Sequence, residues 1–170
     1  ISKLQSGESV DRVRGISYKK GGKIINNPPG DVVDLDAEDV QPYELLDLSK
    51  YSKPAKISYE SSRGCPHRCN FCVNVAAKDV LLAQKSRWRA RSADRIIDDI
   101  LHIKKLFKGR RPIGFEDDMF FVQVKRVEEF CNRLLERGVD ILWTATCRPE
   151  YLAKYDSSFM NLLRRSGCIE

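Results

Sequence analysis

The sequence lacks long apolar runs and is poor in histidine. None of its 170 residues belongs to a stretch that approaches the roughly 20 consecutive apolar residues a membrane-spanning helix needs. No charged segment followed by an apolar one marks a secretory leader, and no internal repeat is visible. The only histidines are His67 and His102. We therefore expect a soluble, cytoplasmic, globular chain with one ordinary core.

The six cysteines are unevenly placed. Cys65, Cys69 and Cys72 fall within one short stretch, which we call the cysteine loop (Cys65–Cys72). The remaining Cys131, Cys147 and Cys168 are scattered through segments with helix or strand patterns. Crowding of this kind favours a metal site in a reducing compartment over a disulfide framework, and we expect Cys131 to be a buried apolar side chain.

The formal charge of +6 is mildly basic, but only residues 78–95 form a concentrated basic run. A solvated or phosphate-adjacent face is the favoured interpretation of this run. A groove for nucleic acid is the second interpretation, and we regard nucleic acid as a disfavoured partner.

The first part of the chain has little regular pattern. Two β-prone runs flank Gly21-Gly22 and predict a hairpin. The acidic, proline-interrupted segment 31–51 indicates a linker with a helical turn at residues 43–48. We expect residues 1–54 to be a hairpin and linker that end a preceding domain, and residues 55–170 to form a second domain.

Strand and helix patterns alternate through that second domain. Strands are expected at residues 55–60, 112–115 and 141–146. Amphipathic helices are expected between Ser92 and Gly109, from Val124 to Gly138, and from Leu152 to Gly167. This alternation predicts an α/β fold of parallel βα repeats joined by right-handed crossovers.

Both ends suggest that the chain is part of a longer protein. It starts at Ile1 without methionine, and residues 166–170 look like the beginning of another strand. With three βα units, the strand at 141–146 would be an open edge, from which we expect self-association or poor stability.

The cysteine loop offers three thiolates to a metal. A structural zinc site needs four ligands, and His67 would have to fold back over its own loop to be the fourth. A 4Fe-4S cluster held by three cysteines leaves one iron open to a small molecule. Iron–sulfur is the favoured interpretation, zinc the second, and a disulfide pair the third.

The pattern Cys65-x-x-x-Cys69-x-Phe71-Cys72 after a first strand resembles the signature of the radical S-adenosylmethionine (SAM) superfamily. The resemblance implies a partial, TIM-like barrel in which Cys65, Cys69 and Cys72 hold a 4Fe-4S cluster and SAM binds the open iron. It also implies that Phe71 packs near the adenine and that SAM cleavage yields a 5′-deoxyadenosyl radical.

Further segments resemble the branch of this superfamily whose catalytic domain follows a cobalamin-binding domain. They are residues 63–66, 88–92, 115–120 and 143–148. The resemblance implies a small-molecule substrate, an electron donor such as flavodoxin or ferredoxin, and cobalamin in the parent protein. Neither histidine lies in the Asp-x-His-x-x-Gly context of a cobalamin ligand.

Other site candidates lie at strand ends. In the family, the position of Glu116, Asp117 and Asp118 contacts the amino group of SAM, and Asp117 and Asp118 are our preferred candidates. Capping of the following helix is the structural alternative. Arg148 could meet an anionic group of SAM, or form a surface ion pair.

Two other functions stay open. A zinc-stabilised module could use the basic run to bind RNA. A tRNA methylthiotransferase-like radical SAM protein would need further modules that this sequence does not contain.

Overall fold

The computed structural model describes residues 2–47, 56–74, 88–107 and 111–170. The chain divides into two compact units, Ile1–Val33 with Arg68–Arg87 and Asp34–His67 with Trp88–Glu170. The domain boundary expected at residue 54 stays a prediction about the parent protein. Within the described ranges, no helix is long and apolar enough to cross a membrane.

The first unit contains α1 (Ser2–Gln5) and the expected hairpin. Strands β1 (Ser17–Lys20) and β2 (Lys23–Asn26) pair antiparallel. The two residues between them, Gly21 and Gly22, have φ angles of 56° and 79°, a conformation that glycine adopts without steric cost. The hairpin prediction is confirmed.

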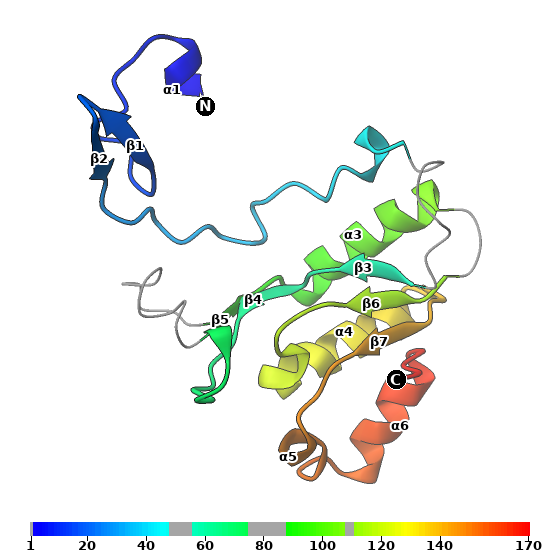
Figure 1. Ribbon diagram of the computed structural model, residues 1–170. Coiled ribbons are helices and arrows are strands. Elements are labelled where there is room, and N and C mark those ends of the chain that lie inside the picture. Colours follow the sequence, from blue (N-terminus) through cyan, green and yellow to red (C-terminus); the bar gives the residue numbers. More distant parts are fainter. Residues whose placement is uncertain (1, 48–55, 75–87, 108–110) are drawn as a thin grey trace. The chain divides into compact units, whose positions relative to one another are not determined.

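A parallel three-stranded sheet is the centre of the second unit (Figure 1). Its strands are β3 (Ile57–Tyr59), β6 (Ile113–Phe115) and β7 (Trp143–Ala145), in the order β3-β6-β7. The register places Ser58, Gly114 and Thr144 in one row across the sheet. The prediction of parallel βα repeats is confirmed; closure into a partial barrel stays a prediction.

The chain's last residues pair with the outer side of β7. The amides of Trp143 and Ala145 donate to the carbonyls of Gly167 and Glu170, at 2.9 and 3.0 Å, and the Ile169 amide returns a bond to Trp143. The expectation of an open edge at residues 141–146 is therefore wrong, because the segment after the last helix already occupies it. The open edge was the reason to expect self-association, and that reason no longer holds.

Four helices follow the strands: α3 (Ala93–Leu106), α4 (Val124–Glu136), α5 (Pro149–Leu152) and α6 (Ser157–Arg165). Ser92 caps α3 by accepting a hydrogen bond from the amide of Arg95, as predicted. The single helix expected from Leu152 to Gly167 is wrong. Asp156 accepts a bond from the Phe159 amide and so starts α6 as a separate helix, which leaves Leu152 exposed.

The second unit also contains short elements, two 3-10 turns and a two-stranded sheet. A 3-10 turn, Tyr43–Leu45, confirms the expected turn near residues 43–48. A second 3-10 turn, Phe120–Val122, precedes α4. Strand β4 (Ser62–Gly64) pairs antiparallel with β5 (Trp88–Ala90), a small sheet that the sequence did not predict.

The core lies on one face of the parallel sheet. Side chains of β3, β6 and β7 that share this face pack against apolar side chains of α3, α4 and α6. At its centre the Trp143 ring meets Phe115 at 5.7 Å and Phe120 and Phe130 at 5.6 Å between centroids. Burial of this face holds the helices on the sheet.

The opposite face of the sheet is polar. Because side chains alternate along a strand, Lys56, Ser58, Gly114, Glu116 and Thr144 point away from the helices. Lys56 and Glu116 form an ion pair at 3.1 Å on this face. A parallel sheet usually carries apolar side chains on both faces, so a polar face marks a place for something other than core packing.

Candidate active site

The cysteine loop follows directly from β4 at the carboxyl end of β3. Cys65 belongs to the second unit, whereas Cys69 and Cys72 belong to the first, where the Cys72 amide donates to the Cys69 carbonyl at 3.0 Å. All three cysteines are half-buried. Among the described residues, no group of three or more His, Cys, Asp or Glu side chains gathers as a metal site. The three-cysteine ligand set therefore stays a prediction.

Within the second unit, His67 faces the helix that follows β7. Its Nε2 atom lies 3.0 Å from the hydroxyl oxygen of Tyr151 in α5, and the two rings meet edge to face at 5.8 Å. The loop after the first parallel strand is therefore in contact with the loop after the third.

The three consecutive acids after β6 have different surroundings. Asp117 is only 3% exposed, whereas Glu116 and Asp118 are both exposed. Glu116 extends over the polar face, where its Oε1 atom also lies 3.3 Å from the Ser58 hydroxyl. The structure thus separates three adjacent acids that the sequence presents as equivalent. Their roles toward SAM stay predictions.

Asp117 accepts hydrogen bonds from the segment that leads to the cysteine loop. Its Oδ1 atom lies 2.7 and 2.6 Å from the amides of Ser61 and Ser62, and its Oδ2 atom accepts from the Ser61 hydroxyl at 2.5 Å. Burial raises the pKa of Asp117 above its ordinary value, while these bonds and the charge of Arg126 oppose that shift.

A second buried acid, Asp99 of α3, binds the last residue of β3, which precedes Ser61 and Ser62 in the chain. It accepts from the Tyr59 hydroxyl at 2.7 Å and pairs with Arg95 at 2.9 Å and with Arg91 at 3.6 Å. Arg91 is buried and also donates to the Leu35 carbonyl at 2.6 Å. For Arg91, the interpretation of the basic run as a solvated face is therefore wrong. Of this run, residues 78–87 lie outside the described residues.

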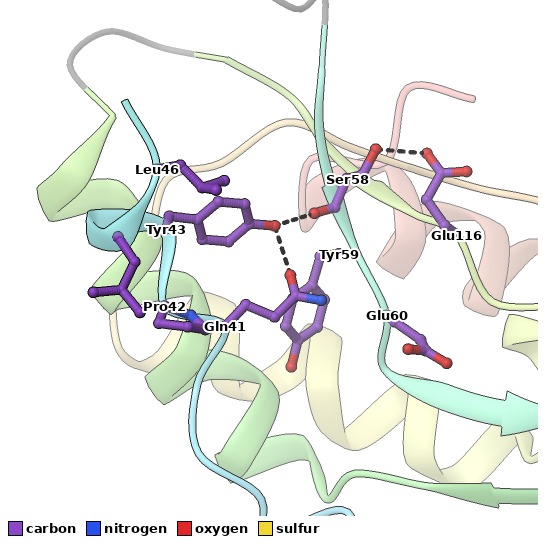
Figure 2. A pocket seen from close by; sticks show the side chains of 9 residues that line it. Gln41, Pro42, Tyr43, Leu46, Ser58, Tyr59, Glu60 and Glu116 are labelled. Atoms are coloured by element: carbon purple, nitrogen blue, oxygen red, sulfur yellow. Dashed lines mark hydrogen bonds between the residues drawn. The ribbon is translucent and has the colours of Figure 1, made fainter. Parts of the chain in front are cut away.

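A pocket of about 560 Å³ opens beside β3 (Figure 2), and its lining is mostly apolar, with Pro42, Leu45 and Leu46 among its residues. Figure 2 shows the Tyr43 ring across it, with its hydroxyl 2.5 Å from the Ser58 carbonyl and 2.6 Å from the Gln41 side chain. Burial raises the pKa of Tyr43. The Ser58 and Glu116 side chains line one wall, and Glu60 lines the end that leads to β4.

The remaining candidates lie apart from that pocket's lining. Arg148, at the start of α5, forms an ion pair with Glu150. A surface ion pair was the alternative to contact with SAM for this residue. Phe71 is 92% exposed. Cys131 is fully buried in the core, as predicted, and burial raises the pKa of its thiol to about 12.

No protein-family model matches the chain. In sequence, it is 31% identical to an uncharacterized methyltransferase of Pyrococcus horikoshii over 99% of this chain and 35% of that protein. It is 28% identical to an anaerobic magnesium-protoporphyrin IX monomethyl ester cyclase of Synechocystis over 98% of this chain and 32% of that protein. The chain thus spans about a third of the length of these relatives.

Two solved structures have the same fold. The cobalamin-dependent SAM radical enzyme OxsB matches 98% of this chain and 24% of its own, with a TM-score of 0.67 and 25% identity. The radical SAM methyltransferase TsrM of Kitasatospora setae matches 98% of this chain and 34% of its own, with a TM-score of 0.64 and 15% identity. The second match concerns the fold alone.

A parallel βα sheet covered by helices makes this an α/β domain, and the three-cysteine loop after its first strand resembles the radical SAM signature. In fold and sequence the chain is similar to the cobalamin-dependent radical SAM enzyme OxsB, and the sequence relatives named above, a methyltransferase and a cyclase, are also enzymes.

Proposed function

We propose that this chain is the part of a radical SAM catalytic domain that binds a 4Fe-4S cluster through Cys65, Cys69 and Cys72 and contributes to the SAM site. The observation that carries the proposal is that the three cysteines follow the carboxyl end of β3 in the chain, directly after β4. Reactive groups of parallel βα folds collect at that end.

The donor set fits the cluster. Three half-buried cysteines in one loop can supply soft thiolate ligands, and iron–sulfur clusters are held by thiolates. When bound, the cluster supplies the electron that cleaves SAM into methionine and a 5′-deoxyadenosyl radical. The resemblance to the superfamily, the fold of OxsB and TsrM and the sequence relatives support this assignment.

The chain's own residues would bind and orient SAM. On the polar face, Glu116 presents an exposed carboxylate that pairs with Lys56. The cationic amino group of SAM could take the place of Lys56 in this ion pair. Asp118 is exposed at the same strand end, and Arg148 carries a charge suited to a carboxylate. Phe71 offers an exposed ring for stacking on the adenine.

For the parent protein we propose cobalamin-dependent chemistry on a small molecule, either methyl transfer or cyclisation. The names of the relatives, a methyltransferase and a cyclase, support both outcomes. An electron donor such as flavodoxin or ferredoxin would supply the reducing electron.

The test is anaerobic reconstitution of the chain with iron and sulfide. We expect brown protein with about four irons per chain, because three thiolates can bind three irons of a 4Fe-4S cluster and leave the fourth iron open. Colourless protein that instead retains one tightly bound zinc would contradict the proposal and favour the zinc-stabilised module.

A matched pair of cysteine variants locates the cluster. Cys69→Ala removes one proposed ligand, so we expect iron binding to be lost. Cys131→Ala removes a thiol that is fully buried in the core, so we expect full iron content and a loss of about 1 kcal/mol in unfolding free energy. Iron and sulfide analysis checks both variants, and equal iron in the two would refute the ligand assignment.

A further inference from the structure

We propose that Asp117 is a positioning residue for the cysteine loop rather than a ligand of SAM. Its carboxylate fastens the start of β4 to the end of β6 and thereby places Cys65 relative to the parallel sheet. This inference rests on the proposed function, because it assigns a task toward the cluster that Cys65 would help to hold.

The first step concerns the availability of Asp117. Both of its oxygens already accept hydrogen bonds from protein donors, three in all, at 2.5 to 2.7 Å. Those donors belong to Ser61 and Ser62, which are 0% and 2% exposed. A SAM amino group would have to break bonds between buried partners and would leave buried donors unsatisfied, which is strongly unfavourable. Glu116 and Asp118, in contrast, are exposed.

The second step concerns what these bonds immobilise. Ser61 has no free polar group: its amide and hydroxyl donate to Asp117, and its carbonyl accepts from the Arg91 amide at 2.8 Å. Ser62 then begins β4, which ends at Gly64, the neighbour of Cys65. Because β4 has only three residues, the bonds that fix Ser62 also fix the position of Cys65.

The third step identifies the counter-charge. Arg126 of α4 is 6% exposed, and its Nη1 atom donates to the Ser61 hydroxyl at 3.1 Å, on the way to Asp117. Its guanidinium also lies over the Trp88 ring at 5.6 Å, and Trp88 is the β5 partner of Gly64. One guanidinium therefore supports both ends of β4.

These contacts join β4, β6 and α4 at a single buried centre. The Ser61 hydroxyl bridges the Asp117 carboxylate and the Arg126 guanidinium, and removal of either charge would leave the other buried without its counter-charge. In metal sites, groups that orient the ligands typically change metal affinity by 10–100-fold when they are mutated. The Asp117–Ser61–Arg126 group would orient a ligand in the same way, because it holds the start of β4 and Cys65 follows β4 directly.

Asp117→Asn tests the proposal, with Asp99→Asn as the matched control. Both acids are 3% exposed, but Asp99 holds Tyr59, Arg91 and Arg95 rather than the start of β4. We expect both variants to lose thermal stability. Only Asp117→Asn should retain iron about 10-fold more weakly against a chelator and alter the EPR spectrum of the reduced cluster.

Ser61→Ala is the second variant, because it keeps both charges and removes only the bridging hydroxyl. We expect the same EPR change in weaker form. If Asp117→Asn does not fold, Ser61→Ala decides: an unchanged spectrum and unchanged iron retention overturn the proposal.

The outcomes also separate this inference from the proposed function. If the unmodified chain takes up no cluster, the proposed function fails. If the chain binds its cluster and Asp117→Asn does so equally well, with an unchanged EPR spectrum but no spectral response to added SAM, Asp117 is a SAM ligand and this inference alone fails.

Discussion

The two faces of the β3-β6-β7 sheet are made by the same strands and yet differ in every physical respect. One face is apolar, fully buried and covered by α3, α4 and α6, with Trp143 at its centre. The other carries Lys56, Ser58 and Glu116 and has a glycine in its middle row. Side-chain alternation thus divides the sheet into a face that stabilises the fold and a face available for binding.

The largest expected effect comes from the apolar face. Trp143→Ala removes a fully buried ring that contacts three aromatic neighbours, and its indole N–H donates to the Ser166 carbonyl at 3.1 Å. We expect a loss of about 3–5 kcal/mol in unfolding free energy, measured by urea denaturation. Trp143→Phe keeps an aromatic ring and should cost clearly less; equal losses in the two variants would show that the cluster is not packed as described.

Periodicity in the sequence was enough to predict the strands of this sheet and two of the helices that cover it. The strands β3, β6 and β7 and the helices α3 and α4 lie where apolar spacing placed them, because burial of one face imposes a regular pattern on the residues. The break between α5 and α6 was missed, because Leu152, Phe159 and Leu163 keep helical spacing across it while Asp156 restarts the helix.

Predicting the site was harder. Strand β4 has no apolar alternation, and its partner β5 follows a long interval in the chain, so neither left a signal. Arg126 and Asp99 are charged residues on helices, which usually indicates exposure, and only their partners in space explain their burial.

The three acids after β6 did leave a signal. If the alternation of Ile113 and Phe115 is continued past the strand, Asp117 falls on the helix-covered side and Glu116 on the other. Alternation could therefore have separated Asp117 from Glu116, whereas the family resemblance treats them as one motif.

An intermediate effect is expected at the sheet edge that both faces share. Gly167 has a φ angle of 94°, and a Cβ atom there would lie 2.0 Å from the Ile141 carbonyl oxygen. Gly167→Ala should therefore cost about 1–3 kcal/mol and weaken the pairing of the last residues with β7. Urea denaturation and amide exchange at Trp143 and Ala145 measure the two effects.

The control for this change is Gly138→Ala. Gly138 also has a positive φ, 59°, but a Cβ atom there would meet nothing within 4 Å. It should show the conformational cost without loss of protection along β7. If Gly167→Ala is no worse than Gly138→Ala, the close approach of the last segment to the sheet is wrong.

The smallest effect on stability is expected on the polar face, where the effect on binding should be largest. Glu116→Gln removes an ion pair with Lys56 whose two side chains are about half exposed, so the unfolding free energy should change by less than about 1 kcal/mol. If Glu116 binds the SAM amino group, SAM affinity should fall about 10-fold, since a hydrogen bond to a charged group contributes about 1.5–3 kcal/mol. Calorimetry on the reconstituted chain measures that affinity.

Lys56→Met is the matched control, because it breaks the same ion pair and leaves the carboxylate in place. It should change stability as little as Glu116→Gln does, and it should preserve or improve SAM binding, since the carboxylate no longer has a competing cation. If Lys56→Met weakens SAM binding and Glu116→Gln does not, the lysine rather than the acid is the binding group. The polar face would then select the carboxylate of SAM instead of its amino group.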